Sequence, residues 1–422
     1  MSDVSSESPL AGRLKKIKPS PTLRITAEAA RLKSEGVDIV SLAAGEPDFG
    51  VPEHVQEAAI ASIRDGKSRY TPSAGIPELR KAIAQKLRTD NGLDYTPDEI
   101  TVGCGAKNIL FTLAQVLFDP KDEIVIPAPY WVTYPDQAFL NDARPLMIRT
   151  READGFTVHP DVLRKAVGRK TKAIILNNPC NPTGAGYTRE QLEQIAEIAL
   201  ECGAWIISDE IYEKIVYDDF EFVATASLSP QVKARTITVN GLSKSHAMTG
   251  WRMGYAAGPA EIIKAMTMVQ SQNISNVTST VQWASVAALT GDQSCLKEMV
   301  AAFQQRKDYV VQRLNGMEGI WCFEPKGAFY AFPRIAHYFA MVDADGNEYK
   351  DSTSLCEYLL KQALVSVIPG AAFGGDEYLR LSFATSMDQL KEGLDRIEQA
   401  LSRLKPGPHY DNYQAHLEQK RF

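Results

Sequence analysis

Short apolar runs alternate with longer segments of helical spacing in the chain up to about Ala256. The apolar runs are typical of strands buried on both faces, and they lie at residues 100–102, 123–127, 171–176, 205–208 and 236–240. Segments with apolar residues on one helical face, such as 107–117 and 189–202, separate most of them. This alternation predicts an α/β fold with a mostly parallel sheet that helices cover on both faces.

Outside this region the pattern predicts mainly helices and a second, smaller α+β part. Helices are expected over residues 22–36, 55–65, 77–91, 260–271, 280–290 and 295–316. Short strands are expected at 39–42, 329–332 and 378–383. From these boundaries we predict a disordered tail (1–12), a small domain (13–50 with 319–422) and a large domain (51–318). The polar end of the chain, 407–422, is predicted to be irregular.

Polar, glycine-rich and aromatic residues gather where five of the predicted strands end. They occupy residues 103–107, 129–131, 177–184, 209–212 and 241–244. Ligands of open α/β sheets sit beyond the carboxyl ends of the strands. We therefore expect these five loops to line one cleft.

Composition and charge narrow the class of protein. The chain is 44% hydrophobic and 23% charged, which is typical of a soluble globular protein. Its net charge of −6 gives no reason to expect nucleic acid as the main partner. No apolar run approaches the roughly 20 residues of a membrane helix. The six cysteines are scattered, without C-x-x-C or metal spacing, which predicts reduced thiols, a cytoplasmic location and no bound metal.

The segment 241–254 carries Lys244 and, eight residues later, Arg252. A desolvated lysine is a nucleophile toward carbonyl groups, and an arginine suits a dianionic phosphate. Taken alone, these two residues are more typical of a surface lysine and of an arginine in a salt bridge. The whole string G-L-S-K-S-H-A-M-T-G-W-R-M-G, however, resembles the lysine signature of the class I and II aminotransferases. These are fold-type I enzymes that use pyridoxal 5′-phosphate (PLP), with a mostly parallel mixed sheet in the PLP-binding large domain and a smaller α+β domain.

Further motifs match the same family in the same order, from about Leu14 to Arg403, and are most similar to its bacterial aspartate aminotransferase branch, which includes aspartate/prephenate enzymes. The motifs N-P-x-N-P-T-G (178–184) and D-E-x-Y (209–212) would each be ordinary alone, as a turn and as a helix cap. The resemblance implies that Asp209 pairs with the pyridine nitrogen of PLP. It also implies that Tyr212 and Asn181 bind the phenolate oxygen.

The resemblance assigns further residues to the cofactor. Backbone groups at a helix start bind the phosphate, and Trp131 stacks on the ring. The phosphate would contact Gly105, Ala106, Lys107, Ser243 and Arg252. One position departs from the pattern, because Gly241 stands where many relatives have a phosphate-binding serine, and Ser243 is a possible substitute.

The resemblance also implies how substrate is bound. Arg380 would clamp the α-carboxylate, and Gly45 would lie in a loop that closes over the substrate, which Trp131 and Asn181 also contact. Tyr70 would reach the cofactor phosphate of a neighbouring subunit, which implies a homodimer with shared active sites.

The implied reaction is ping-pong transamination, with amino acids and 2-oxo acids as partners. Lys244 carries PLP as a Schiff base and serves as the general base at Cα. The amino group of L-aspartate would pass to 2-oxoglutarate, giving oxaloacetate and L-glutamate, and the side chain of Lys107 would bind the distal carboxylate.

Three alternatives stay open from the sequence. The enzyme could transaminate prephenate, aromatic amino acids or alanine instead, with Arg13, Lys15 or Lys16 helping to bind prephenate. It could be a PLP-dependent β-lyase, which would release pyruvate without an oxo-acid acceptor. It could be a regulatory protein on the same scaffold, although Lys244 is retained and residues 1–30 leave no room for a DNA-binding domain.

Overall fold

The structure is a computed structural model that describes residues 10–17 and 21–419. The predicted tail therefore lies outside the described residues as far as residue 9, and a short 3₁₀ helix, η1 (Gly12–Lys16), follows. Within the described residues, no helix is long and apolar enough to cross a membrane.

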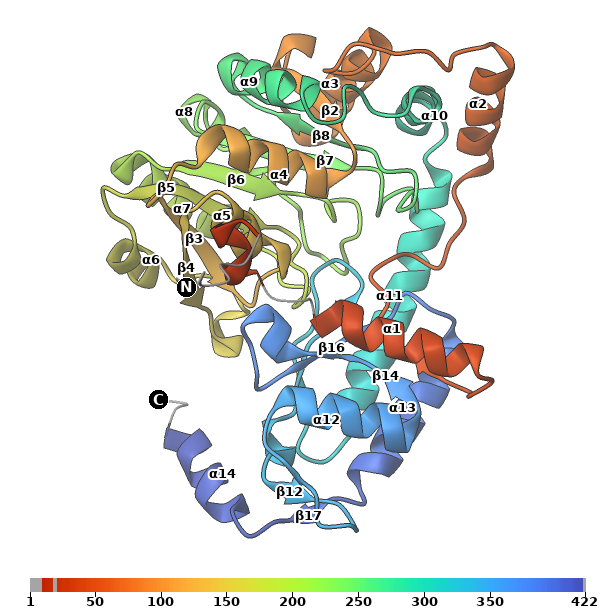
Figure 1. Ribbon diagram of the computed structural model, residues 1–422, viewed down its shortest axis with the longest axis vertical. Coiled ribbons are helices and arrows are strands. Elements are labelled where there is room, and N and C mark those ends of the chain that lie inside the picture. Colours follow the sequence, from red (N-terminus) through yellow and green to blue (C-terminus); the bar gives the residue numbers. More distant parts are fainter. Residues whose placement is uncertain (1–9, 18–20, 420–422) are drawn as a thin grey trace, which may run out of the picture.

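A seven-stranded sheet forms the centre of the larger part, in the order β2-β8-β7-β6-β5-β3-β4 (Figure 1). Its strands are β2 (Ile100–Gly103), β3 (Glu123–Ala128), β4 (Arg144–Arg149), β5 (Thr171–Asn177), β6 (Trp205–Asp209), β7 (Thr236–Gly241) and β8 (Gly254–Ala257). Neighbours from β4 to β7 run parallel, whereas β8 is antiparallel to β7 and β2. The predicted mostly parallel α/β sheet is thus confirmed.

Two strands of this sheet, β4 and β8, were not predicted from the sequence, for different reasons. β4 is an edge strand with the sequence R-P-L-M-I-R, in which a proline and the two terminal arginines leave an apolar run of only three residues. β8 is fully buried but consists of the sequence G-Y-A-A, and glycine and alanine favour strands weakly.

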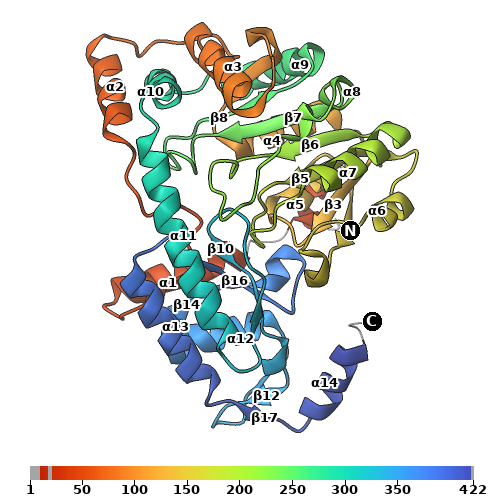
Figure 2. The same ribbon diagram turned by 180° about the vertical axis from the view of Figure 1, so that it is seen from behind.

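Helices cover both faces of the sheet. One face is covered by α4 (Ala106–Leu117), α5 (Thr133–Leu140) and α9 (Ala260–Ser271), and the other by α6 (Pro160–Ala166), α7 (Arg189–Cys202) and α8 (Pro230–Lys233) (Figures 1 and 2). Beyond the β2 edge lie α2 (Glu53–Arg64), α3 (Pro77–Asn91) and α10 (Ser279–Thr290). The helices start with recognisable signals, as in α7, where Thr188 and Gln191 form a capping box.

The long helix α11 (Ser294–Asn315) leads from the larger part into a second, smaller part (Figure 2). Here β1 (Val40–Ser41) pairs with β14 (Val365–Ser366), and β16 (Leu379–Ser382) lies between β10 (Tyr330–Ala331) and β15 (Ile368–Pro369). Around them pack α1 (Pro21–Ser34), α12 (Ser352–Tyr358) and α13 (Met387–Leu401). The pairing of an N-terminal with a C-terminal strand supports the predicted division into residues 51–318 and a small domain built from both ends, which stays a proposal.

The remaining strands are short: β9 (Trp321–Cys322), β11 (Pro333–Arg334), β12 (Met341–Val342), β13 (Glu348–Tyr349) and β17 (Lys405–Pro406). The prediction of an irregular C-terminus is wrong, because α14 (Tyr410–Gln419) follows β17. This helix is anchored by Tyr410 on His337 and by Tyr413 on Phe339. Two aromatic anchors in a polar helix leave no apolar period for the sequence pattern to detect.

Candidate active site

A cavity of about 440 Å³ lies where the carboxyl ends of the parallel strands face the smaller part. Every predicted loop contributes to its wall, as expected. Of the predicted site residues, the structure brings together Gly45, Ala106, Lys107, Trp131, Asn181, Asp209, Tyr212, Ser243, Lys244, Arg252 and Arg380. Gly105 lies directly behind Arg252, whereas Tyr70 lies elsewhere.

Lys244 lies in the loop that follows β7. Its Nζ donates a hydrogen bond to the carbonyl oxygen of Gly45 at 2.5 Å. Desolvation lowers the pKa of Lys244 to about 8, an effect that the carboxylate of Glu46 opposes and the guanidinium of Arg380 reinforces. A lysine amine of this kind is partly neutral near physiological pH and can serve as a nucleophile or a base.

Asp209, the last residue of β6, is buried on the cavity floor. The hydroxyl of Tyr134 donates to its Oδ2 at 2.7 Å. Burial raises the pKa of Asp209 to about 6, although the hydrogen bond from Tyr134 acts against this shift. Sequence reasoning missed Tyr134 because a tyrosine within an apolar helix usually packs in the core; its only signal is its place three residues after Trp131.

Tyr212 follows β6, and its hydroxyl contacts that of Tyr330, a second site residue that the sequence did not predict. Its hydroxyl lies 2.9 Å from that of Tyr330 on β10. Burial raises the pKa of both tyrosines, so both remain neutral. The Arg380 guanidinium lies 4.5 Å from the centre of the Tyr330 ring. Tyr330 therefore connects Tyr212 with Arg380.

Arg380 extends from β16 into the cavity. Its Nη1 donates to Oδ1 of Asn181 and its Nη2 to the carbonyl of Ala43, both at 3.0 Å. Its Nε is buried without a partner among the described residues. Because buried donors in proteins are normally satisfied, this guanidinium can take an acceptor such as a carboxylate.

The start of α4 forms one corner of the cavity. Gly105 precedes the helix with a φ of 83° and no side-chain cap, so the first helical N–H groups are open to an anion. Arg252 packs against this glycine so closely that a Cβ on Gly105 would lie 2.5 Å from its Nη2. Ser243 lines the same cavity. This corner suits a phosphate.

Gly241 has no room for a side chain in this backbone. A Cβ there would lie 2.8 Å from the carbonyl oxygen of Met253. Local packing therefore leaves no space for the serine that many relatives have at this position. Ser243 is the serine of this loop that lines the cavity.

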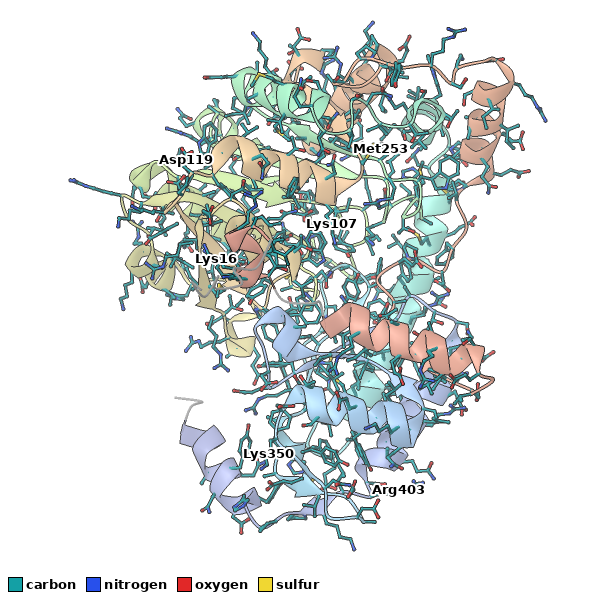
Figure 3. The ribbon with its side chains drawn as sticks, in the orientation of Figure 1. Lys16, Lys107, Asp119, Met253, Lys350 and Arg403 are labelled. Carbon is teal, nitrogen blue, oxygen red and sulfur yellow. The ribbon has the colours of Figure 1, made fainter. Side chains whose placement is uncertain are left out.

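Lys107, labelled in Figure 3, is the second residue of α4. Its Nζ is 4.8 Å from the centre of the Trp131 ring, a cation–π contact. Desolvation lowers the pKa of Lys107, and the charge of Arg252 acts in the same direction. Lys107 thus lines the cavity, although the residue as a whole is exposed.

Other predicted cations do not reach the cavity. Lys16 forms an ion pair with Asp142 at 3.1 Å on the outside of the larger part (Figure 3). Arg13 and Lys15 lie in the same 3₁₀ helix and do not line the cavity either. Tyr70, in the loop between α2 and α3, is 92% exposed.

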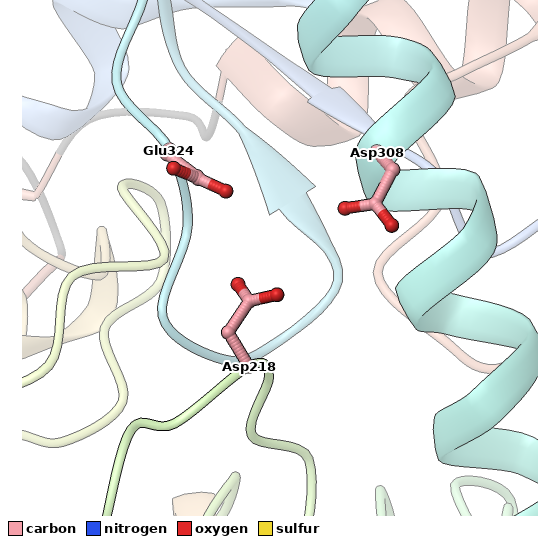
Figure 4. A group of neighbouring side chains, drawn as sticks. All are labelled: Asp218, Asp308 and Glu324. Carbon is pink, nitrogen blue, oxygen red and sulfur yellow. The ribbon is translucent and has the colours of Figure 1, made fainter.

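One group of carboxylates has the spacing of a metal site: Asp218, Asp308 and Glu324 (Figure 4). However, Nζ of the buried Lys307 lies 2.6 Å from Asp218 and 3.0 Å from each of the other two carboxylates. The lysine ammonium already supplies the positive charge that this group requires.

Comparison with known proteins gives consistent relatives. The family model "Aminotransferase class I and II" matches residues 37–397. The aspartate aminotransferase of Bacillus sp. (strain YM-2) is 45% identical over 92% of this chain and 98% of its own. A probable aspartate/prephenate aminotransferase of Aquifex aeolicus is 45% identical over 94% and 99%.

Solved structures agree with these relatives. The crystal structure of the aspartate aminotransferase from Rhizobium meliloti has a TM-score of 0.91 at 46% identity and covers 94% of this chain and 100% of its own. The Thermus thermophilus aspartate aminotransferase with maleate has a TM-score of 0.88 at 39% identity, with coverage of 93% and 100%.

Proposed function

The chain belongs to the class I and II aminotransferases, and from this premise we propose that it is a PLP-dependent aspartate aminotransferase that passes the amino group of L-aspartate to 2-oxoglutarate. One observation carries the choice of a dicarboxylic substrate. Two cations of the cavity, Arg380 and Lys107, contact neutral groups, and among the residues described neither forms an ion pair with a carboxylate. The names of the relatives support the same choice.

The residues of the cavity fit PLP. Lys244 would bind its aldehyde carbon, Asp209 would face the pyridine nitrogen, and Trp131 would stack on the ring. Its phosphate would lie at the start of α4 beside Arg252, where helical N–H groups are uncapped. When bound, PLP supplies an electron sink for the Cα carbanion.

The chain's own residues orient the substrate and move its proton. Arg380 binds the α-carboxylate through its fork of donors, and Lys107 binds the distal carboxylate. Once the substrate amine has replaced it, Lys244, with its lowered pKa, would accept the proton from Cα and deliver it to the former aldehyde carbon of PLP. The buried hydroxyl of Tyr212 and the amide of Asn181 would hold the phenolate oxygen.

An absorbance titration of the PLP-loaded protein tests the proposal. L-Aspartate should abolish the visible band and 2-oxoglutarate should restore it, whereas Lys244→Ala should show neither change. Conversion by L-phenylalanine but not by L-aspartate would refute aspartate as the donor. Pyruvate release without an oxo-acid acceptor would indicate a β-lyase instead.

Prephenate is a second candidate acceptor, because one relative is named a probable aspartate/prephenate enzyme. The basic residues that were expected to help do not line the cavity, so Lys107 would have to bind the second carboxylate of prephenate. Restoration of the visible band by prephenate, after conversion with L-aspartate, would support this activity.

We also propose a homodimer with shared active sites. Tyr70 is exposed and lies outside its own cavity, so a contact with a neighbouring subunit would give this side chain a function. Sedimentation at several protein concentrations should give the mass of a dimer.

A further inference from the structure

Lys244 and Arg380 lie on different parts of the molecule. Lys244 follows β7 of the seven-stranded sheet, whereas Arg380 lies on β16 of the smaller part. A substrate bound by Arg380 must present its Cα to Lys244, so the spacing between the two parts governs the geometry of the reaction. Contacts between the parts that lie next to Arg380 are therefore of special interest.

One such contact joins the segment after β4 to the start of β16. The hydroxyl of Tyr378 donates a hydrogen bond to Oε2 of Glu152 at 2.9 Å. Tyr378 is buried and precedes Arg380 by two residues. Burial raises the pKa of Tyr378, and the charge of Glu152 adds to the effect, so the hydroxyl stays a donor across the working pH range.

Aromatic packing holds the Tyr378 ring in this position. It stacks on Phe332 at 4.9 Å with an angle of 12° between the ring planes. Phe156, from the same segment as Glu152, meets Tyr378 edge-on at 5.4 Å and Phe332 at 6.0 Å. The hydroxyl therefore has little freedom to leave Glu152.

A neighbouring ion pair is a weaker link. Arg149 and Glu377 lie 2.9 Å apart, but the Arg149 side chain is 68% exposed. Exposed ion pairs contribute little because water and salt screen them.

The other end of β16 is fixed independently, since the N–H of Ser382 donates to the carbonyl of Leu42 at 2.7 Å. Arg380 lies between this contact and Tyr378. We propose that Glu152 and Tyr378 are positioning residues, whose hydrogen bond holds Arg380 at its working distance from Lys244. The proposal rests on the aminotransferase function given above.

The test uses the PLP-loaded protein and the variants Tyr378→Phe, Glu152→Ala and Glu152→Gln. Displacement of Arg380 should weaken binding of the carboxylate, and because it also shifts Cα relative to Lys244, it should slow turnover. We expect Tyr378→Phe and Glu152→Ala to raise the KM for L-aspartate and the Kd of maleate about three- to tenfold and to lower kcat by a similar factor. Glu152→Gln keeps an acceptor and should have a smaller effect. The double variant Tyr378→Phe/Glu152→Ala should be no worse than either single variant.

Tyr338→Phe is a matched control. This tyrosine is also buried in the smaller part, and its hydroxyl donates to the carbonyl of Glu318 at 2.5 Å, away from β16. Tyr338→Phe should lower Tm without raising the KM for L-aspartate. The proposal is wrong if Tyr378→Phe also lowers only Tm, or if the effects of the two single variants add. Failure of the wild-type protein to bind PLP or to turn over L-aspartate would instead refute the aminotransferase function.

Discussion

The hydroxyl groups of Tyr212 and Tyr330 lie 2.9 Å apart, which brings β10 of the smaller part into contact with the loop that follows β6. The ring of Tyr330 also supports the guanidinium of Arg380. One tyrosine thus contacts both the proposed partner of the cofactor oxygen and the proposed carboxylate clamp.

Substitution of Tyr330 can separate these two contacts. Tyr330→Phe removes the hydrogen bond to Tyr212 but keeps a ring under Arg380. We expect kcat to fall about three- to tenfold while KM for L-aspartate stays near the wild-type value. Tyr330→Leu removes the ring as well and should also raise KM. Steady-state kinetics of both variants will distinguish the two effects, and equal kinetics of Tyr330→Phe and wild type would show that the hydroxyl has no role.

Lys107 is expected to select for an acidic donor. Lys107→Met removes the charge at similar length. It should lower kcat/KM for L-aspartate about 10- to 100-fold, the usual effect of losing a charge-assisted hydrogen bond. Turnover of L-phenylalanine should change far less, because that substrate has no distal carboxylate. An equal loss for both donors would indicate that Lys107 acts through the phosphate instead.

The buried carboxyl of Asp209 predicts a pH-dependent stability of the PLP-free protein. Its folded pKa of about 6 lies above the ordinary value of 3.8. The folded state thus binds a proton more tightly than the unfolded chain, and this stabilisation is lost as the pH rises through about 6. Asp209→Asn should therefore raise Tm by about 2–4 °C at pH 8 and make little difference at pH 4. A Tm difference that is the same at pH 4, 6 and 8 would contradict this explanation.

Shared active sites can be tested by mixing inactive subunits. A dimer of one Tyr70→Ala chain and one Lys244→Ala chain contains one site with both native residues. Random assembly of equal amounts should restore about a quarter of the wild-type activity. If the mixture is no more active than the average of the two separate variants, Tyr70 does not act across an interface.

The packing of Gly241 predicts that a serine cannot simply be restored there. Gly241→Ser should lower Tm, because its Cβ would lie 2.8 Å from the Met253 carbonyl oxygen. It should not tighten PLP binding, whereas Ser243→Ala should weaken it. Tighter PLP binding by Gly241→Ser would mean that the loop can adapt.

The sequence predicted the fold and the family well because both depend on local signals. Buried parallel strands are continuous apolar runs, and the order of motifs around Lys244 is specific to the class I and II aminotransferases, whose family membership the comparisons confirm. The edge strand β4 and the alanine-rich β8 lacked such runs.

The missed site residues lacked local signals as well. Tyr134 and Tyr330 look like core residues in the sequence, and only the fold shows that their hydroxyls meet Asp209 and Tyr212. In α14, the helical residues are anchored on side chains some 70 positions earlier in the chain, a relationship that no short window can reveal.

Val40 pairs with Val365, and the adjacent Ser41 and Ser366 are 325 residues apart in sequence. During synthesis on the ribosome, β1 can therefore pair with β14 only after most of the chain has been made. The seven-stranded sheet, whose strands all lie between Ile100 and Ala257, has no such delay. The sheet can form while the chain is still growing, whereas β16, which carries Arg380, is synthesised later. A chain that ends before β16 would therefore retain Lys244 but lack the arginine that is proposed to bind the substrate carboxylate.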